Sequence, residues 1–232
     1  MMNEIPFFYY SALMDAHGSI LLDEDTRRHV VTVLRMQAGS QLMLMDGKGL
    51  AANVVVEQAD KKILRVSISE KKSYPQPISK TILAISLLKN TSRFEWMLEK
   101  VTEIGLTDVV PIISERTEKI HFREDRMRQI IISAAIQSKQ MWMPVLHAPK
   151  KFEELIANST GTSKFIAHCL SGEKKTLSRQ DEDSLLLVGP EGDFTSSEIE
   201  LALQHSFIPV SLGESRLRTE TAGVVGAVLM KI

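Results

Sequence analysis

Two glycine-punctuated loops in the last third of the chain carry the residue types best suited to holding a small ligand. The first, GPEGD, begins at Gly189 after an apolar run that ends at Val188. The second begins at Gly213, after the short strand-like stretch Val210-Ser211-Leu212, and continues to Gly223. A strand, a glycine loop and a helix in succession present backbone N–H groups to a ligand. Because the two loops lie close together in the sequence, they predict one composite pocket.

Several common sequence signatures are missing, and their absence reduces the number of ligand and reaction classes to consider. Neither loop matches G-x-G-x-x-G or G-x-x-x-x-G-K-[ST], so neither a dinucleotide nor an NTP phosphate chain is the expected ligand. The six histidines and one cysteine show no metal-ligand spacing, and no G-x-S-x-G elbow indicates a serine hydrolase. We therefore expect no metal site. The single cysteine, Cys169, is expected to be a buried small hydrophobe in a reducing compartment.

Composition and charge describe an ordinary globular protein. Hydrophobic residues make up 44% and charged residues 25%, and the formal net charge is −1. No apolar run approaches the roughly 20 residues of a membrane helix, and the N-terminus lacks the pattern of a signal peptide. We expect a cytoplasmic protein with no membrane partner. The net charge gives no sign of nucleic acid, but residues 116–151 are locally basic, which suits either an RNA-binding face or a solvated helix face.

The N-terminal part, residues 1–72, reads as a small β-rich domain. Residues 29–36 suit a short helix, and the proline-containing stretch 70–80 is typical of a linker. The expected strands and the turns between them are 41–45, the Asp46-Gly47 turn, 51–57, the Asp60-Lys61 turn and 62–68.

The rest of the chain, residues 73–232, alternates strand and helix and therefore predicts an α/β domain. Capping boxes at 92–95 and 195–198 would start two of its helices. The expected strands are 81–88, 109–113, 145–146, 164–169, 185–188 and 209–212. The expected helices are 92–104, 123–140, 152–157, 195–205 and 219–230.

The two loops also carry a family resemblance. GPEGDFTSSE from Gly189 and LGESRLRTETA from Leu212, taken together, closely resemble the C-terminal signature of the SPOUT-class RNA methyltransferases. Within that class the chain resembles the RsmE family, which methylates N3 of a uridine in small-subunit ribosomal RNA. Residues 99–106 are similar to the family's E-K-x-T-E-L-G motif, and residues 29–36 to its H-x-x-x-V-L-R segment.

The resemblance implies a fold, a cofactor and partners. The expected fold is a trefoil-knotted SPOUT α/β domain preceded by a PUA-like β-barrel that docks RNA. The expected cofactor is S-adenosylmethionine, held in a bent form with Leu212 and Leu217 against the adenine faces. The expected partners are 16S rRNA within the small ribosomal subunit and a second copy of the chain. The cofactor contacts carried over from the family are His168, Gly189, Glu191, Gly192, Leu212, Gly213, Leu217, Arg218 and Thr219.

Catalysis at uracil N3 needs help because this nitrogen carries a proton and is a poor nucleophile when neutral. Either a general base or a cation that stabilises the uracilate would serve. We assign Arg218 to the cationic role and Glu191 to the role of base. A cation at the start of a helix is locally unfavourable, so Arg218 should have an anionic partner. Glu191, Glu220, a phosphate and the substrate base are all open as that partner.

The expected RNA contacts lie on both domains. In the helix that holds Lys139, Ile136 and Gln140 replace the acid and the arginine of the family pattern A-x-E-Q-x-x-R. The residues assigned to the RNA backbone are Arg27, Arg28 and Arg35 in the first domain, and Arg123, Arg126 and Lys139 in the second.

The last helix carries small residues, among them Gly223 and Gly226, that would permit close approach of a second helix in a homodimer. Packing of these residues against the chain's own sheet is the alternative.

Two other functions also remain open. One is a SPOUT enzyme that acts on a ribose 2′-OH or on guanine N1, and the other is a non-catalytic rRNA-binding assembly factor.

Overall fold

The computed structural model describes residues 5–159 and 163–232 of the chain. Contacts within it divide the chain into two compact units. The first unit runs to Gln76 and also takes in Ala135–Trp142, whereas the second comprises Pro77–Ala134 and Met143–Ile232. The segment Ala135–Trp142 belongs to the part of the sequence predicted as α/β, and no local pattern in it indicates that it packs with the N-terminal unit.

The first unit is built on one five-stranded sheet in the order β1-β3-β4-β5-β2. Its pairings are antiparallel except for that between β1 and β3. A short helix, α1 (Glu24–Arg28), leads directly into one turn of π-helix at His29–Val33, and buried Val30 joins the core of the unit. The strands are β1 (Phe7–Tyr9), β2 (Ser19–Leu21), β3 (Gln41–Met45), β4 (Leu50–Ala59) and β5 (Leu64–Ser73).

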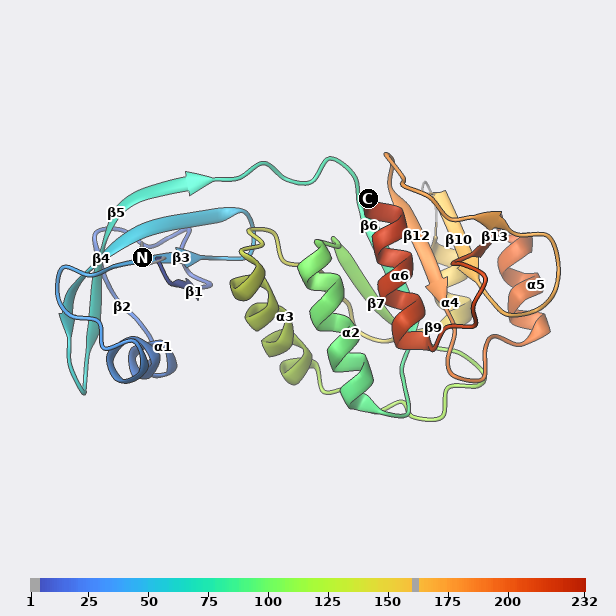
Figure 1. Cartoon of the computed structure of the whole chain (residues 1–232), viewed down its shortest axis with the longest axis horizontal. Helices are drawn as coiled ribbons and strands as arrows, with labels where there is room; N and C mark the ends of the chain where they lie inside the picture. Colours follow the sequence, from blue (N-terminus) through green and yellow to red (C-terminus); the bar gives the residue numbers. More distant parts are fainter. Residues whose placement is uncertain (1–4, 160–162) are drawn as a thin grey trace. The chain divides into compact units, whose positions relative to one another are not determined.

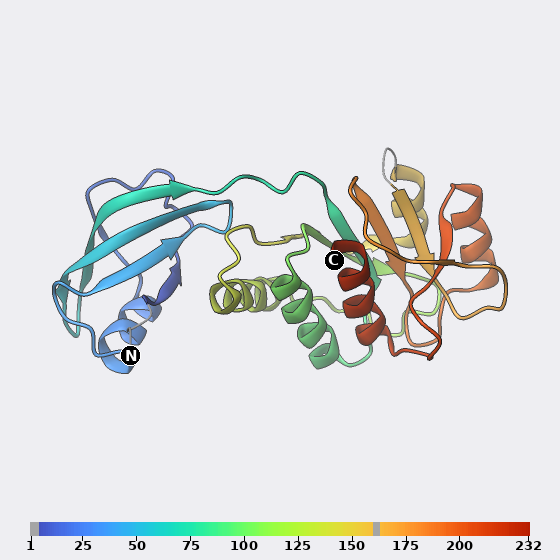
Figure 2. The ribbon, with the colours of Figure 1, turned by 45° about the horizontal axis from the view of Figure 1, so that its top comes forward.

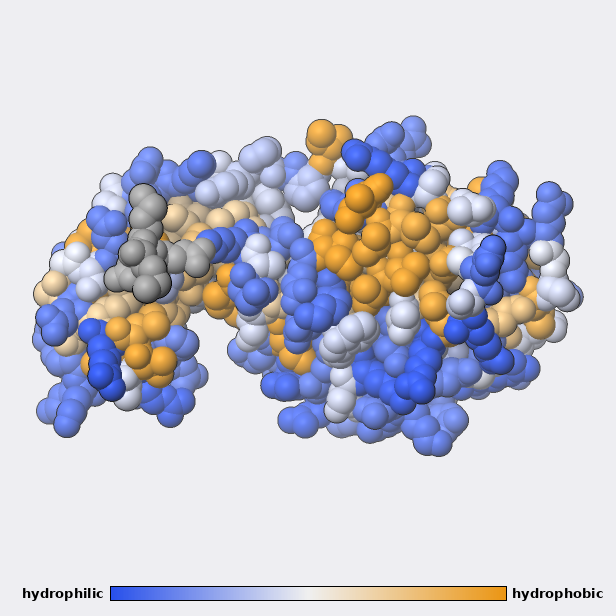
Figure 3. All heavy atoms as spheres, viewed as in Figure 1, coloured by the Kyte–Doolittle hydropathy of each residue, from blue (hydrophilic) through white to orange (hydrophobic). Residues whose placement is uncertain are grey.

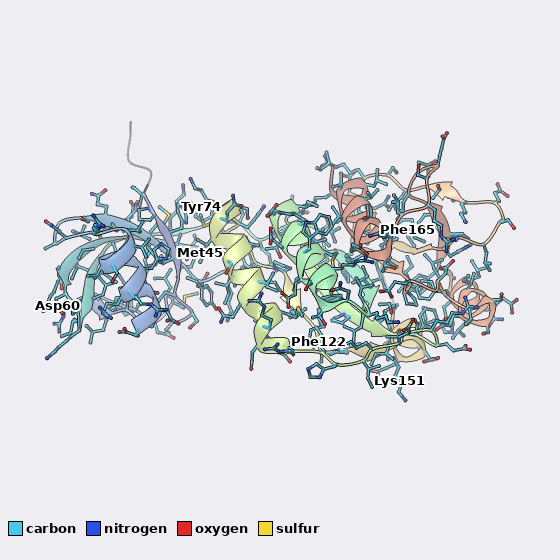
Figure 4. The ribbon with its side chains drawn as sticks, turned by 60° about the horizontal axis from the view of Figure 1, so that its bottom comes forward. Met45, Asp60, Tyr74, Phe122, Lys151 and Phe165 are labelled. Carbon is cyan, nitrogen blue, oxygen red and sulfur yellow. The ribbon has the colours of Figure 1, made fainter. Side chains whose placement is uncertain are left out.

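Two aspartates shape the hairpin turns of this sheet, as the sequence predicts. Asp46 Oδ1 accepts hydrogen bonds from the backbone N–H groups of Lys48 and Leu50, at 2.7 and 3.0 Å. Asp60 lies at the tip of the β4–β5 hairpin (Figure 4), where its Oδ1 accepts from Lys62 N at 2.7 Å. The expected start of the linker at residue 70 is wrong, because β5 stays paired with β4 as far as Ser73.

The segment Ala135–Trp142 is fastened to the first unit by its last residues. The backbone N–H of Gly49 donates to the carbonyl of Met141 at 2.9 Å, and Trp142 Nε1 donates to the carbonyl of Tyr74 at 3.2 Å. Gly49 has a φ of +89°, and a Cβ there would collide with the indole ring of Trp142. Glycine is therefore required at position 49 both by its backbone conformation and by the close packing of Trp142.

The second unit has an eight-stranded sheet in the order β11-β13-β10-β12-β6-β7-β8, with β9 beside β7. All of its pairings are parallel, and the apolar runs of the sequence suit such buried strands. The strands are β6 (Thr81–Ser86), β7 (Asp108–Ile113), β8 (Val145–Leu146), β9 (Lys150–Lys151), β10 (Ser163–Ala167), β11 (Lys175–Thr176), β12 (Ser184–Val188) and β13 (Ile208–Ser211).

Helices cover both faces of this sheet, which confirms the α/β prediction. One core cluster joins residues of α2, α3 and α6 to the sheet, and a second joins residues of α4 and α5 to the opposite face. Figures 1 and 2 show α2 and α6 side by side. The helices are α2 (Thr91–Ile104), α3 (Glu124–Ser138), α4 (Phe152–Asn158), α5 (Ser196–Gln204) and α6 (Thr219–Lys231).

The two predicted capping boxes have different outcomes. At α5 the box is present: Glu198 N donates to Thr195 Oγ1, and Glu198 Oε2 accepts from Thr195 N at 2.8 Å. At α2 the prediction is wrong, because the N-cap is Asn90, whose Oδ1 accepts from Ser92 N at 3.0 Å. Asparagine caps a helix as well as serine does, so the helix begins earlier than expected.

The small residues of α6 serve the chain's own sheet. A Cβ at Gly223 would lie 2.8 Å from Ile85 Cδ1, and one at Gly226 would collide with Leu186 Cδ2. The structure therefore favours the alternative explanation for these glycines: they let α6 pack closely on β6 and β12.

Candidate active site

A cleft of about 750 Å³ opens where β10, β12 and β13 end, which is the edge of a parallel sheet where ligands commonly bind. The first glycine loop follows β12 and the second follows β13, so the two loops do share one pocket. All of the cofactor contacts expected from the family line this cleft except Gly192. The cleft is also lined by residues that neither the motifs nor the family resemblance indicated, notably Arg93, Cys169, Lys174, Asp193 and Arg216.

Gly189 is required by packing within the first loop. A Cβ at this position would lie 3.1 Å from both the backbone N and Cδ2 of Phe194. The positive φ in this loop belongs to Asp193, at 62°. The loop therefore folds tightly around buried Phe194, and a branched side chain at Gly189 would push the two apart.

Gly192 lies beside the cleft and not in its lining. Its carbonyl accepts a hydrogen bond from Arg116 Nη1 at 2.8 Å. Nearby, Glu198 Oε1 accepts from the backbone N–H of Glu115 at 2.8 Å. These two contacts join the first glycine loop and the start of α5 to the connection that follows β7.

The second loop depends on backbone conformation at Gly213. Its φ is +133°, a region that residues with a Cβ rarely adopt, although the space around it is open. Ser211 Oγ donates to the carbonyl of Gly213 at 3.0 Å. Leu212 and Leu217, which flank the exposed part of the loop, are half-buried and present apolar surface to the cleft.

The end of β10 contributes a polar corner to the cleft. The Nδ1 atom of His168 is buried and has no hydrogen-bond partner among the described residues. Burial lowers the pKa of His168 below its ordinary value, and the positive charge of Lys174 adds to this effect. Lys174 Nζ donates to the carbonyl of His168 at 2.7 Å, and Asp193 Oδ2 accepts from Cys169 N at 2.7 Å.

The prediction that Cys169 is buried is wrong: it is exposed, since its strand ends two residues earlier.

Arg218 is the N-cap residue of α6 and is exposed in the cleft. In the described part of the chain it forms no ion pair. Glu191 Oε1 accepts from Lys89 N at 3.2 Å, and Glu220 Oε1 lies 3.6 Å from Arg93 Nε. Both carboxylates that could have neutralised Arg218 therefore have other partners.

The residues of the first unit that were expected to contact RNA differ in their exposure and in their contacts with other residues of the chain. Arg27 has only 11% of its side chain exposed, and it donates to Glu24 and to the carbonyl of Asp60. Arg28 is exposed and lies 3.7 Å from Asp25. Arg35, also exposed, follows the π-helix with a φ of +52°. Lys139, in the segment that packs with this unit, lies over the ring of Phe7.

In the second unit, the two predicted RNA contacts lie at the start of α3. Arg126 Nη2 forms an ion pair with Glu95 Oε2 of α2 at 2.9 Å, so part of its charge is neutralised. Arg123 is exposed just before the helix.

Over residues 5–159 and 163–232 the structure contains no cluster of side chains that could hold a metal ion. No helix in the same ranges is long and apolar enough to cross a membrane.

Comparison with known proteins identifies the class. Residues 75–231 match the family model described as RNA methyltransferase domain, and residues 22–69 match the RNA methyltransferase PUA domain. The ribosomal RNA small subunit methyltransferase E of Synechocystis sp. is 32% identical over 219 residues, which are 90% of this chain and 71% of that protein.

Two solved structures share the whole architecture. A probable rRNA-methyltransferase from Porphyromonas gingivalis is 40% identical, covers 96% of this chain and 95% of its own, and has a TM-score of 0.89. A ribosomal RNA small subunit methyltransferase E from Neisseria gonorrhoeae, bound to S-adenosyl methionine, is 27% identical, with 97% and 95% covered and a TM-score of 0.82.

These matches define an RNA methyltransferase domain preceded by a PUA domain. The chain belongs to the ribosomal RNA small subunit methyltransferase E family.

Proposed function

We propose that this protein transfers a methyl group from S-adenosylmethionine to N3 of a uridine in 16S rRNA of the small ribosomal subunit. The observation that carries the proposal is the single cleft formed by both glycine loops, in a chain whose relative from Neisseria gonorrhoeae binds S-adenosyl methionine. The family to which the chain belongs indicates RNA as the methyl acceptor.

The cleft has the chemistry that this cofactor requires. S-adenosylmethionine combines a flat adenine, a sulfonium cation and a zwitterionic amino-acid end. Leu212 and Leu217 offer apolar surface for the adenine, while Glu191 and Asp193 offer negative charge. The buried, unpartnered Nδ1 of His168 is a polar atom that a ligand in the cleft would satisfy.

Two residues would carry the methyl transfer. The cofactor supplies the methyl group: its S–CH₃ bond breaks as the N3–CH₃ bond forms, and the N3 proton must leave. Arg218, which has no competing carboxylate partner in the described chain, would stabilise the negative charge of the uracilate. Glu191, exposed at the cleft, would accept the proton.

RNA binding would use exposed cations on each unit. Arg28, Arg35 and Arg123 are exposed and suited to phosphate contact. Arg27 and Arg126 already donate to carboxylates of the chain, so their contribution should be smaller. Since the substrate would be ribosomal RNA, we place the protein in the cytoplasm.

We also infer a homodimer formed by α6. Thr221, Val225 and Val228 recur at helical spacing on its partly exposed side, and Ile232, which is 78% exposed, continues the stripe. Figure 3 shows hydrophobic residues gathered over this helix. A second copy of α6 would cover this stripe.

The dimer is tested by charge on that stripe. Val228→Lys should convert a dimer into monomers in light scattering at micromolar concentration. Leu203→Lys, an equally drastic change at a 43% exposed position of α5, should leave the dimer intact. A wild-type protein that is active and monomeric would refute the dimer.

The function is tested in cells that lack this protein. Nucleoside mass spectrometry of their 16S rRNA should show loss of one 3-methyluridine, restored by the wild-type gene. Loss of a 2′-O-methylated nucleotide or of 1-methylguanosine, with 3-methyluridine unchanged, would refute the proposed position of methylation.

A further inference from the structure

We propose that Arg93 binds an oxyanion of the RNA substrate at the edge of the cleft. This inference rests on the proposed function and adds a residue that neither the motifs nor the family resemblance assigned. Arg93 lies in the first turn of α2 and lines the same cleft as Arg218 and Glu191.

The guanidinium of Arg93 has unused hydrogen-bonding capacity. Its side chain is 39% exposed and donates no hydrogen bond within the described ranges. Its sole ion-pair partner there is Glu220, whose Oε1 lies 3.6 Å from Nε. Charge-assisted hydrogen bonds are usually about 2.7–2.9 Å long, so this pair is an electrostatic contact that does not use the N–H donors of Arg93 in a close hydrogen bond.

Local structure alone does not favour an arginine at this position. The first turn of a helix attracts negative charge and disfavours positive charge, and the first turn of α2 contains no acidic residue to compensate. Glu220, with 9% of its side chain exposed, supplies some compensation from the first turn of α6. An anionic ligand in the cleft would supply the rest.

The surroundings favour RNA over the cofactor as the source of that anion. Lys119 Nζ donates to Thr91 Oγ1 at 3.2 Å, so a second cation lies at the same end of α2 but outside the cleft lining. Lys89, also outside that lining, is 71% exposed and pairs with Glu118. Of Arg93, Lys89 and Lys119, a ligand confined to the cleft would reach only Arg93, whereas a polyanion that extends past the cleft would meet the two lysines as well.

The main difficulty for a test is Glu220, because removing Arg93 leaves a buried carboxylate without its cation. Arg93→Ala alone would therefore confuse a structural role with RNA binding. The informative comparison is Arg93→Ala/Glu220→Gln against Glu220→Gln, since both lack the buried charge. Arg93→Lys keeps the charge, and Arg179→Ala removes an exposed arginine of the same unit outside the cleft.

The RNA for the test is the small subunit purified from cells that lack this protein. Relative to Glu220→Gln, the double variant should bind it about five- to tenfold more weakly, with a salt slope smaller by about 1, if Arg93 meets a phosphate. If Arg93 meets the deprotonated uracil, the single-turnover rate at saturating RNA should instead fall about a hundredfold. In both cases S-adenosylhomocysteine affinity stays unchanged and Arg179→Ala stays near wild type, while Arg93→Lys, which keeps the charge but loses the planar guanidinium, falls between wild type and the double variant.

Two results would overturn the inference. One is a double variant that matches Glu220→Gln in RNA affinity, salt slope and saturated rate, which would leave Arg93 as a structural partner of Glu220. The other is a loss of S-adenosylhomocysteine affinity with RNA affinity intact, which would place the anion on the cofactor. Failure of the proposed function is distinct, because the wild type itself would then methylate no subunit, while the RNA-affinity comparison would still test Arg93.

Discussion

The carboxylate of Glu198 accepts a hydrogen bond from the backbone N–H of Glu115 at 2.8 Å, across the connection between β7 and α3. The same buried side chain caps α5 through Thr195. The carboxylate of Glu198 thus holds together the start of α5, which follows the first glycine loop, and the connection between β7 and α3. Glu198→Gln should lower the free energy of unfolding by about 1–3 kcal/mol, because glutamine has one amide oxygen and its NH2 group cannot accept, so one of the two N–H groups loses its partner.

Denaturant unfolding measures this loss, and calorimetry with S-adenosylhomocysteine should show weaker binding. Glu200→Gln is the matched control, an exposed position on the same helix. Equal stability of the two variants would show that the Glu115–Glu198 contact does not hold the loop.

Gly213→Val should abolish S-adenosylhomocysteine binding, because a branched residue strains a φ of +133° and the loop must change shape. Gly39→Val is the control, since it places the same strain at a φ of +87° in the first unit, with equally open space around it. If both variants are folded and Gly213→Val binds the ligand as tightly as wild type, the second loop is not part of the cofactor site.

Arg218→Ala should lower the single-turnover rate at saturating RNA and cofactor by about a hundredfold, the loss expected for a cation that stabilises a developing negative charge. S-adenosylhomocysteine affinity should change little. A variant that loses cofactor affinity but keeps its saturated rate would make Arg218 a residue that braces the loop.

His168 should make stability depend on pH. Its pKa is lowered, mainly by burial, so the folded chain binds the proton less tightly than the unfolded chain does. Stability from this group is therefore complete above the unfolded pKa of about 6.5 and is lost as the pH falls below it. The Tm of the wild type should fall more between about pH 7.5 and pH 5 than that of His168→Gln. Parallel curves for the two proteins would contradict this cause.

Local patterns were enough to predict most of the fold. Apolar runs gave the buried strands, and the aspartates of the hairpin turns and the Thr195–Glu198 box act as their residue types suggest. The packing of Ala135–Trp142 with the first unit could not be predicted from local patterns. It depends on the contact of Trp142 with Gly49, and these two residues are far apart in the sequence. The trefoil knot stays a prediction from the family resemblance.

For the site, the loops were visible in the sequence but their supports were not. Gly189 and Gly213 stand out as glycines between a strand and a helix. Nothing local indicates that Arg116 reaches the carbonyl of Gly192 or that Arg93 pairs with Glu220, because each contact joins segments that only the sheet order brings together. An arginine in the first turn of α2, where the helix dipole disfavours a cation, was the one available signal for Arg93.

The most direct test of the central claim is methyl transfer by the purified protein. Small subunits from cells lacking it would be incubated with S-adenosylmethionine, and their 16S rRNA mapped by mass spectrometry. We predict one new methyl group per subunit, on N3 of a single uridine, and its absence with Arg218→Ala at short reaction times. Subunits that bind the protein tightly yet gain no methyl group would contradict the account and identify a non-catalytic binding factor.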